Sequence, residues 1–105
     1  MKVIQQYQGG YSLLTTSKYI VPALPIYSLS TELEVQRVFE NGRPTNEIQA
    51  YKAWFVQEGL EPFQVKFLEE IELPDFLSVV EFDNLEACEI KRNVYFRANG
   101  INEVK

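Results

Sequence analysis

Histidine is absent from the 105 residues, and Cys88 is the only cysteine. Without histidine, the sequence excludes Ser-His-Asp and Cys-His catalysis and every histidine metal site. One cysteine permits neither an intrachain disulfide nor a zinc site built from several thiolates, and it fits a reducing compartment. We therefore expect a protein that is not an enzyme and that holds no cofactor and no metal.

Long apolar runs are also missing. The longest, residues 19–29, is interrupted by Pro22 and Pro25 and is far shorter than the roughly 20 residues that a membrane span needs. The first residues lack the apolar stretch of a signal peptide. We expect a soluble, cytoplasmic protein without membrane contact, in which residues 1–105 form a single domain around one modest core.

Positive charge is scarce overall, since the formal net charge is −5. Residues 1–52 hold five basic and four acidic side chains, whereas residues 53–105 hold five basic and eleven acidic ones. Nucleic-acid-binding proteins usually show a basic footprint, although one face can be positive while the whole chain is negative. The acidic half is typical of a solvated surface, and it also permits a surface that imitates DNA.

The chain is rich in the β-branched and aromatic residues that favour strands. Asn41-Gly42 is the strongest turn signal, Arg92-Asn93 predicts a second hairpin, and Pro22 and Pro25 predict an edge strand or extended crossing over residues 18–27. Residues 11–17 favour no single structure. Strands are predicted over residues 2–7, 31–40 (half-buried), 63–67, 79–82, 86–90, 94–98 and 101–104.

The segment 45–58 fits two structures. A helix would end at Gly59, whereas a strand would place Lys52 and Trp54 on one face and Ala53 on the other. The Asn-Gly turn just before the segment favours the strand. The sequence therefore predicts a mainly β fold, a small five- to six-stranded OB-like barrel with at most one or two short helices.

A pattern of turns and strands covers the chain from Phe39 onward. Its features are Asn41-Gly42, Glu47-Ile48, the alternating strand 63–67, Val80 to Asn84, and then Tyr95, Ala98 and Ile101. The pattern resembles small proteins of integrative conjugative elements of Gram-positive bacteria, some thought to help a helicase progress. It is similar to the single-stranded-DNA-binding proteins of filamentous phages. The resemblance implies an OB-like barrel, single-stranded DNA as ligand, a helicase or other host protein as partner, and a homodimer.

Non-specific binding of single-stranded DNA needs cations for phosphates and aromatic planes on which bases stack. Strand alternation places Lys52 beside Trp54 and Tyr95 beside Arg97. The run Gly42-Arg43-Pro44 is similar to a Gly-basic-Pro run of the phage proteins. The candidate nucleic-acid-binding residues are Arg43, Lys52, Trp54, Lys66, Tyr95 and Arg97. The competing interpretations are a core position for Trp54, a plain cross-strand contact for Tyr95 with Arg97, and solvated side chains for Arg43 and Lys66.

The leading hypothesis is a non-catalytic single-stranded-DNA-binding protein of a phage, plasmid or conjugative element, acting in replication or transfer. The alternative is a mobile-element protein that binds and inhibits a host protein, such as a nuclease, through an acidic surface. The acidic residues 69–75 lack the spacing of a calcium loop and are predicted to be a solvated strand end. Cys88 is predicted to be buried. A tyrosine-rich N-terminal segment, with Tyr7, Tyr11, Tyr19 and Tyr27, fits both a binding groove and a dimer interface.

Overall fold

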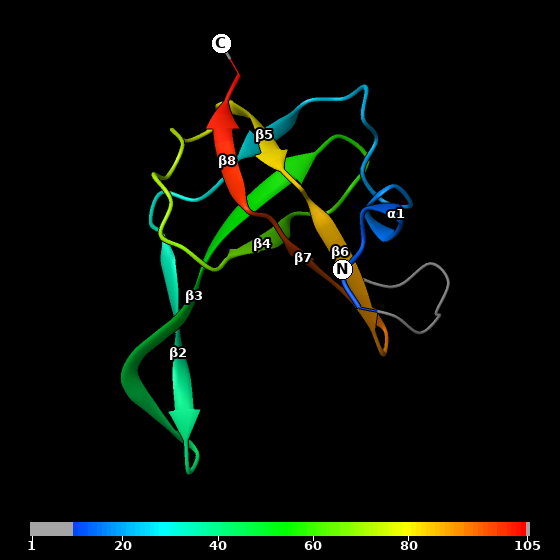
Figure 1. Ribbon diagram of the computed structural model, residues 1–105. Coiled ribbons are helices and arrows are strands. Elements are labelled where there is room, and N and C mark those ends of the chain that lie inside the picture. Colours follow the sequence, from blue (N-terminus) through cyan, green and yellow to red (C-terminus); the bar gives the residue numbers. More distant parts are fainter. Residues whose placement is uncertain (1–9, 105) are drawn as a thin grey trace.

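The computed structural model describes residues 10–104, which form one short helix and eight strands (Figure 1). The expectation of a mainly β fold is confirmed, while the strand predicted over residues 2–7 lies outside the described residues. Within residues 10–104 no helix is long and apolar enough to cross a bilayer. The elements are α1 (Leu13–Thr16), β1 (Ile26–Ser28), β2 (Glu34–Glu40), β3 (Arg43–Gln57), β4 (Phe63–Phe67), β5 (Val79–Asp83), β6 (Glu86–Ile90), β7 (Asn93–Arg97) and β8 (Gly100–Glu103).

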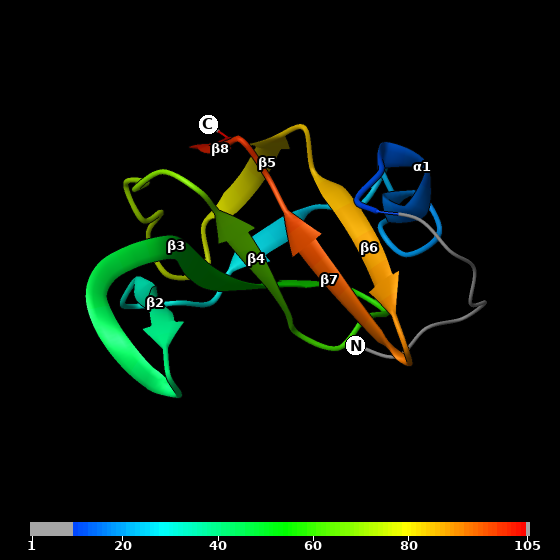
Figure 2. The ribbon, with the colours of Figure 1, turned by 60° about the horizontal axis from the view of Figure 1, so that its bottom comes forward.

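One sheet holds all of these strands. Its order is β6-β7-β4-β3-β1-β5-β8, and β2 pairs with β3 outside that path. The pairing of β4 with β7 is parallel, and the other pairings are antiparallel. Figure 2 shows β4, β7 and β6 side by side, with β3 crossing behind β4. Segments distant in the sequence therefore become neighbours on one surface.

The ambiguous segment after the Asn-Gly turn is a strand, as predicted. Residues 45–57 all lie in β3, the 15-residue strand that is the longest element of the described chain. Asn41 and Gly42 have φ of +53° and +77°, the pair of positive values that a two-residue hairpin turn requires. Along β3 the fully buried Ala53 and Phe55 alternate with the outward-facing Lys52 and Trp54. A helix is excluded for this segment.

The hairpin of β2 and the first half of β3 extends away from the rest of the sheet as an arm (Figure 1). The strand predicted over residues 31–40 is present as β2, but the expectation that it is half-buried is wrong, because Val35 and Phe39 are 45% and 64% exposed. Alternation places apolar side chains on one face, but burial also needs a second layer against that face. Since β2 pairs with β3 alone, its apolar side chains stay in solvent.

Phenylalanine rings fill the core between the strands. The Phe55 and Phe82 rings meet edge to face with centroids 4.9 Å apart, and Phe63 and Phe96 lie 5.0 Å apart. Edge-to-face contact is a favoured geometry for aromatic pairs, and the large apolar area of such rings dominates small cores. The rings come from β3, β4, β5 and β7, so one cluster connects these four strands.

Two local predictions are corrected. The strand after the two prolines, β1, is central and lies between β3 and β5, because it begins just after Pro25 and no proline interrupts its hydrogen bonds. The second hairpin turns at Lys91-Arg92, one residue earlier than predicted. Lys91 takes the positive φ of +57°, and Ile90 pairs with Asn93.

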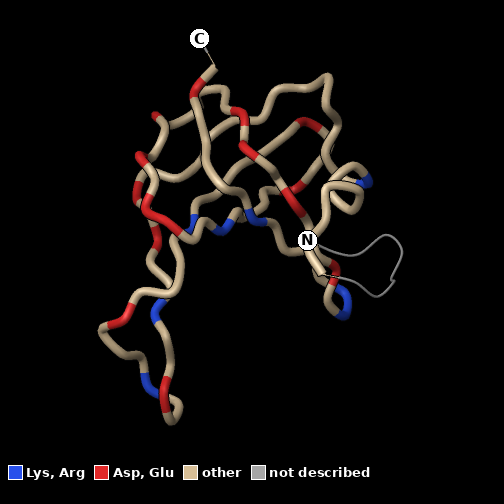
Figure 3. The backbone as a smooth tube through the Cα atoms, viewed as in Figure 1, with Lys and Arg blue, Asp and Glu red and all other residues tan. Residues whose placement is uncertain are grey.

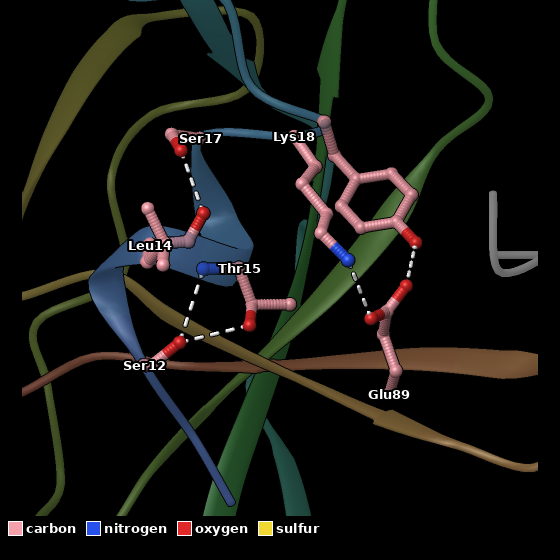
Figure 4. A network of polar contacts seen from close by, with 7 residues as sticks. Ser12, Leu14, Thr15, Ser17, Lys18 and Glu89 are labelled. Carbon is pink, nitrogen blue, oxygen red and sulfur yellow. Dashed lines mark hydrogen bonds and ion pairs between the residues drawn. The ribbon is translucent and has the colours of Figure 1, made fainter. Parts of the chain in front are cut away.

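A buried carboxylate attaches the N-terminal segment to β6 (Figure 4). The Glu89 side chain is 2% exposed, and its Oε1 accepts a hydrogen bond from Lys18 Nζ at 2.9 Å. The Tyr19 hydroxyl donates to its other oxygen. Burial by itself raises the pKa of a carboxyl, but the hydrogen bonds from Tyr19 and Lys18 outweigh it, so the pKa of Glu89 is lowered. The folded state therefore stabilises the charged form of the Glu89 carboxyl.

The Glu89 contacts predict a pH-dependent part of the stability. Because the pKa is lower in the folded chain, this contribution is complete above the unfolded pKa of about 4.3 and is lost as the pH falls through the folded value. Glu89→Gln should lower the free energy of unfolding at pH 7 by about 1–3 kcal/mol, measured by urea denaturation. The difference from the parent chain should shrink below pH 4. An equal difference at pH 3 and pH 7 would contradict this assignment.

Candidate functional site

Three cations form a row across three neighbouring strands. Lys52 of β3 pairs directly with Lys66 of β4, and Lys66 pairs with Arg97 of β7. Directly paired residues point to the same face of a sheet, and Figure 3 shows the blue positions of these strands side by side. Val65 and Phe96, one position away, are buried on the other face. The core packing therefore turns all three cations outward, and we call them the cationic row.

Exposed aromatic side chains flank the cationic row. Trp54 lies two residues beyond Lys52 and Tyr95 two residues before Arg97, so alternation puts both rings on the outer face. Trp54 is 41% exposed and Tyr95 46%, which excludes the core interpretation of Trp54. Lys52 and Lys66 of the row and the two rings line a groove of about 420 Å³, while Arg97 lies next to Lys66 outside its lining. The groove is lined by Tyr11, Gln36, Lys52, Trp54, Pro62, Phe63, Gln64, Lys66, Ile90, Val94, Tyr95 and Phe96.

Tyr11 closes one side of this groove. Its ring centroid lies 4.2 Å from Cζ of Arg97 and 5.5 Å from Nζ of Lys66, within the range of cation–π attraction. The neighbouring Ser12 bridges Ala87 of β6, which brings the segment to the sheet edge. Burial raises the pKa of the Tyr11 hydroxyl, so it remains a neutral donor. The tyrosine-rich segment was the only sequence signal for this residue.

A carboxylate orients the tryptophan. Trp54 Nε1 and Gln64 Nε2 both donate to Oε2 of Glu34, each at 2.9 Å. Glu34 lies directly opposite Lys52 in the register of β2 and β3, yet its hydrogen bonds go to the indole and the amide. The hydrogen bond from Nε1 restricts rotation of the indole, and the second bond, from Gln64, holds the Glu34 carboxylate in place. Sequence alternation alone gave no signal for this contact.

The three cations differ in their partners. Arg97 Nε donates to Glu86 Oε1 at 3.0 Å. Among residues 10–104, neither Lys52 nor Lys66 forms an ion pair. Like charges directly opposite on adjacent strands are destabilising, and the chain has 15 acidic residues against 10 basic ones. Two unneutralised lysines side by side are thus a cost to the fold, which is typical of a binding surface.

Arg43 lies apart from the other predicted site residues. It is exposed at the end of the arm, where it pairs with Glu40 beside the turn. It precedes Lys52 by nine positions on β3, or about 30 Å along an extended strand. The structure brings together Lys52, Trp54, Lys66, Tyr95 and Arg97 and leaves Arg43 outside the groove.

The part of the chain that the structure describes shows no metal site and no exposed cysteine. No cluster of three metal-ligating side chains occurs there, and Cys88 is buried, as predicted. The chain matches no family model, no curated protein and no solved structure. The groove and its charges are therefore the observations from which a function must be inferred.

The repulsion between the paired lysines predicts that removing one stabilises the fold. Lys52→Gln should raise the free energy of unfolding by about 0.2–1 kcal/mol at low salt, measured by urea denaturation. In about 1 M salt, where charges are screened beyond roughly 3 Å, the gain should disappear. A loss of stability at low salt would mean that Lys52 has a structural role in this face.

Proposed function

We propose that this protein binds single-stranded DNA without catalysis, on the outer face of β3, β4 and β7. The observation that carries the proposal is the cationic row flanked by exposed aromatic rings. Phosphates need fixed cations, and bases need flat apolar surfaces. The groove supplies both within one connected surface of a protein whose net charge is −5.

The dimensions of the face suit a single strand. Neighbouring strands lie about 4.8 Å apart, so the cationic row extends over roughly 10 Å, enough for two or three phosphates. Glu34 and Glu86 lie in register at the two ends of the row and limit its length. The rings of Trp54 and Tyr95 can stack only on unpaired bases, which favours single strands over duplex DNA.

The strand pairings support an OB-like barrel as the framework. Two residues separate β5 from β6 and two separate β7 from β8, so each pair counts as one bent strand. Five strands then remain beside the arm, and the pairings of β1 with β5 and of β4 with β7 join them into a closed circuit. In OB folds the second and third strands carry the oligonucleotide-binding face. Here those strands are β3 and β4, which hold Lys52, Trp54 and Lys66.

The biological setting that we propose rests on the sequence resemblance. It places the protein in the cytoplasm, in replication or transfer of a phage, plasmid or conjugative element. There it coats a single strand and hands it to a helicase or another host protein. A homodimer is part of the same proposal. The acidic alternative, inhibition of a host protein, gains support only if the groove binds no DNA.

The cationic row predicts the salt dependence of binding. With three phosphate contacts, the slope of log affinity against log salt should be about −2, at roughly −0.7 per contact for single strands. The measurement is fluorescence anisotropy of a labelled oligothymidylate at several salt concentrations. Lys66→Gln should flatten the slope by about 0.7 and weaken binding of all sequences alike.

Arg43→Gln is the matched control, because it makes the same change in net charge outside the groove. It should leave the slope unchanged within error. Equal effects of the two substitutions would show that overall charge, and not the groove, governs binding. If no binding is detected even at low salt, the DNA proposal fails and the host-protein inhibitor replaces it.

Trp54 provides a second test, because it is the only tryptophan. Stacking of a base should quench its fluorescence when oligothymidylate is added. By anisotropy, Trp54→Ala should weaken binding by about 1–3 kcal/mol, while Trp54→Phe should weaken it only slightly. Urea denaturation of both variants checks that the fold persists. Unquenched fluorescence at saturating DNA would remove Trp54 from the site.

A further inference from the structure

The connection between β4 and β5 combines strong negative charge with anchored ends. Residues 68–78 contain four carboxylates and neither lysine nor arginine. Ile71 and Leu73 pack against the core, and Pro74 is buried. The segment is therefore anchored to the core of the sheet. The four carboxylates, all exposed, belong to Glu69, Glu70, Glu72 and Asp75.

A tight turn at the end of this segment presents two large apolar side chains to solvent. Ser78 N donates to Asp75 O at 3.0 Å, and Leu77 N donates to Ser28 O at 2.7 Å. Asp75 N donates to Glu103 Oε1 at 2.8 Å. Phe76 and Leu77, at the centre of the turn, are 56% and 54% exposed. We call residues 75–78 the acidic turn.

The acidic turn has features that stability alone does not explain. Leu77 has a φ of +65° at the third turn position, where glycine or asparagine is the usual residue. Leucine at a left-handed position is strained, and its side chain gains no burial in return. Strain combined with a rigid, exposed pair of apolar side chains is typical of a surface that binds a partner.

We propose that the acidic turn docks into the cationic groove of a second copy of this chain. The two surfaces are complementary in charge and in apolar character. The turn offers Phe76 and Leu77 beside the Asp75 carboxylate, at the end of a segment that also carries Glu69, Glu70 and Glu72. The groove offers Trp54 and Tyr95 beside the cationic row. A groove of about 420 Å³ has room for one benzyl side chain. Because the turn is already rigid, little conformational entropy is lost on docking.

The contact joins different copies. The turn is hydrogen-bonded to Ser28 of β1 and Glu103 of β8, and none of residues 75–78 lines the groove of its own chain. A turn that meets a groove is a heterologous contact, which continues head to tail or closes into a ring. It therefore differs from the symmetric dimer that the resemblance implies.

Under the proposed function, the docked turn and single-stranded DNA compete. Both place negative charge on the cationic row and a flat ring against the groove aromatics. In self-associated copies the groove is occupied by the turn, and single-stranded DNA dissociates these assemblies by displacing it. This regulatory step rests on the proposed function, whereas the docking itself does not.

Sedimentation velocity of the full chain tests the turn. The parent chain should associate as its concentration rises at low salt and dissociate at high salt, because the contact is electrostatic. Phe76→Ser and Leu77→Gly should each weaken association about tenfold or more. Leu77→Gly should at the same time keep or raise the melting temperature, since glycine relieves the strained φ. Leu14→Ser, which alters a 74% exposed leucine on α1, is the control and should leave association unchanged.

Mixing two variants tests the groove. Lys66→Glu alters the groove and keeps the turn, while Phe76→Ser alters the turn and keeps the groove; Lys52→Glu replaces Lys66→Glu if that variant is unstable. Each variant alone should be monomeric. Their mixture should form a one-to-one complex and nothing larger, because only one intact turn and one intact groove are available to each pair.

A parent chain that stays monomeric at low salt, a mixture that forms no complex, or equal weakening by Leu14→Ser would each overturn the docking proposal. Oligothymidylate should dissociate the parent assemblies. Assemblies that persist with DNA bound would show that the groove does not receive the turn. A one-to-one complex in a protein that binds no DNA would uphold the docking and refute the proposed function, so the two failures are distinguishable.

Discussion

The register of β4 between β3 and β7 is the constraint on which the rest of the structure depends. Side chains alternate strictly along a strand, so burial of Val65 and Phe67 forces Lys66 outward. A slip of one residue would exchange the two faces and bury a lysine without a partner, at large cost. The same strand register therefore produces both the apolar core and the charged groove, and a change of register would remove both.

The acidic side chain opposite the paired lysines does not neutralise them. Glu34 uses its carboxylate on Trp54 and Gln64, although Lys52 lies opposite. The paired lysines consequently remain without an ion-pair partner among residues 10–104. Packing of the aromatic core offsets the free-energy cost of their repulsion. Most of the excess carboxylates lie in the second half of the chain, in part on the segment after β4. A chain with a net charge of −5 can thus carry a basic, aromatic surface and an acidic surface that complements it.

Where the sequence patterns misled, the missing information was what lies above a strand and beside it. The alternation of residues 31–40 is genuine, but no second layer covers β2, so Val35 and Phe39 remain exposed. The two prolines suggested an edge strand, but the central strand β1 begins at Ile26, directly after Pro25. Propensity describes a segment in isolation, while burial and position in a sheet depend on neighbours that are distant in the chain.

The sequence by itself determined the local structure: a mainly β chain, the Asn41-Gly42 turn, and the outward direction of Lys66 between Val65 and Phe67. Period-two alternation and positive-φ turns are short-range properties, which is why they could be predicted. Only the tertiary structure decided which outward residues meet. The parallel pairing of β4 with β7 places Lys66 beside Arg97, and the bridge from Ser12 to β6 brings the Tyr11 ring over both. Such contacts join segments far apart in the chain, and their register follows from packing of the whole core, which no local pattern records.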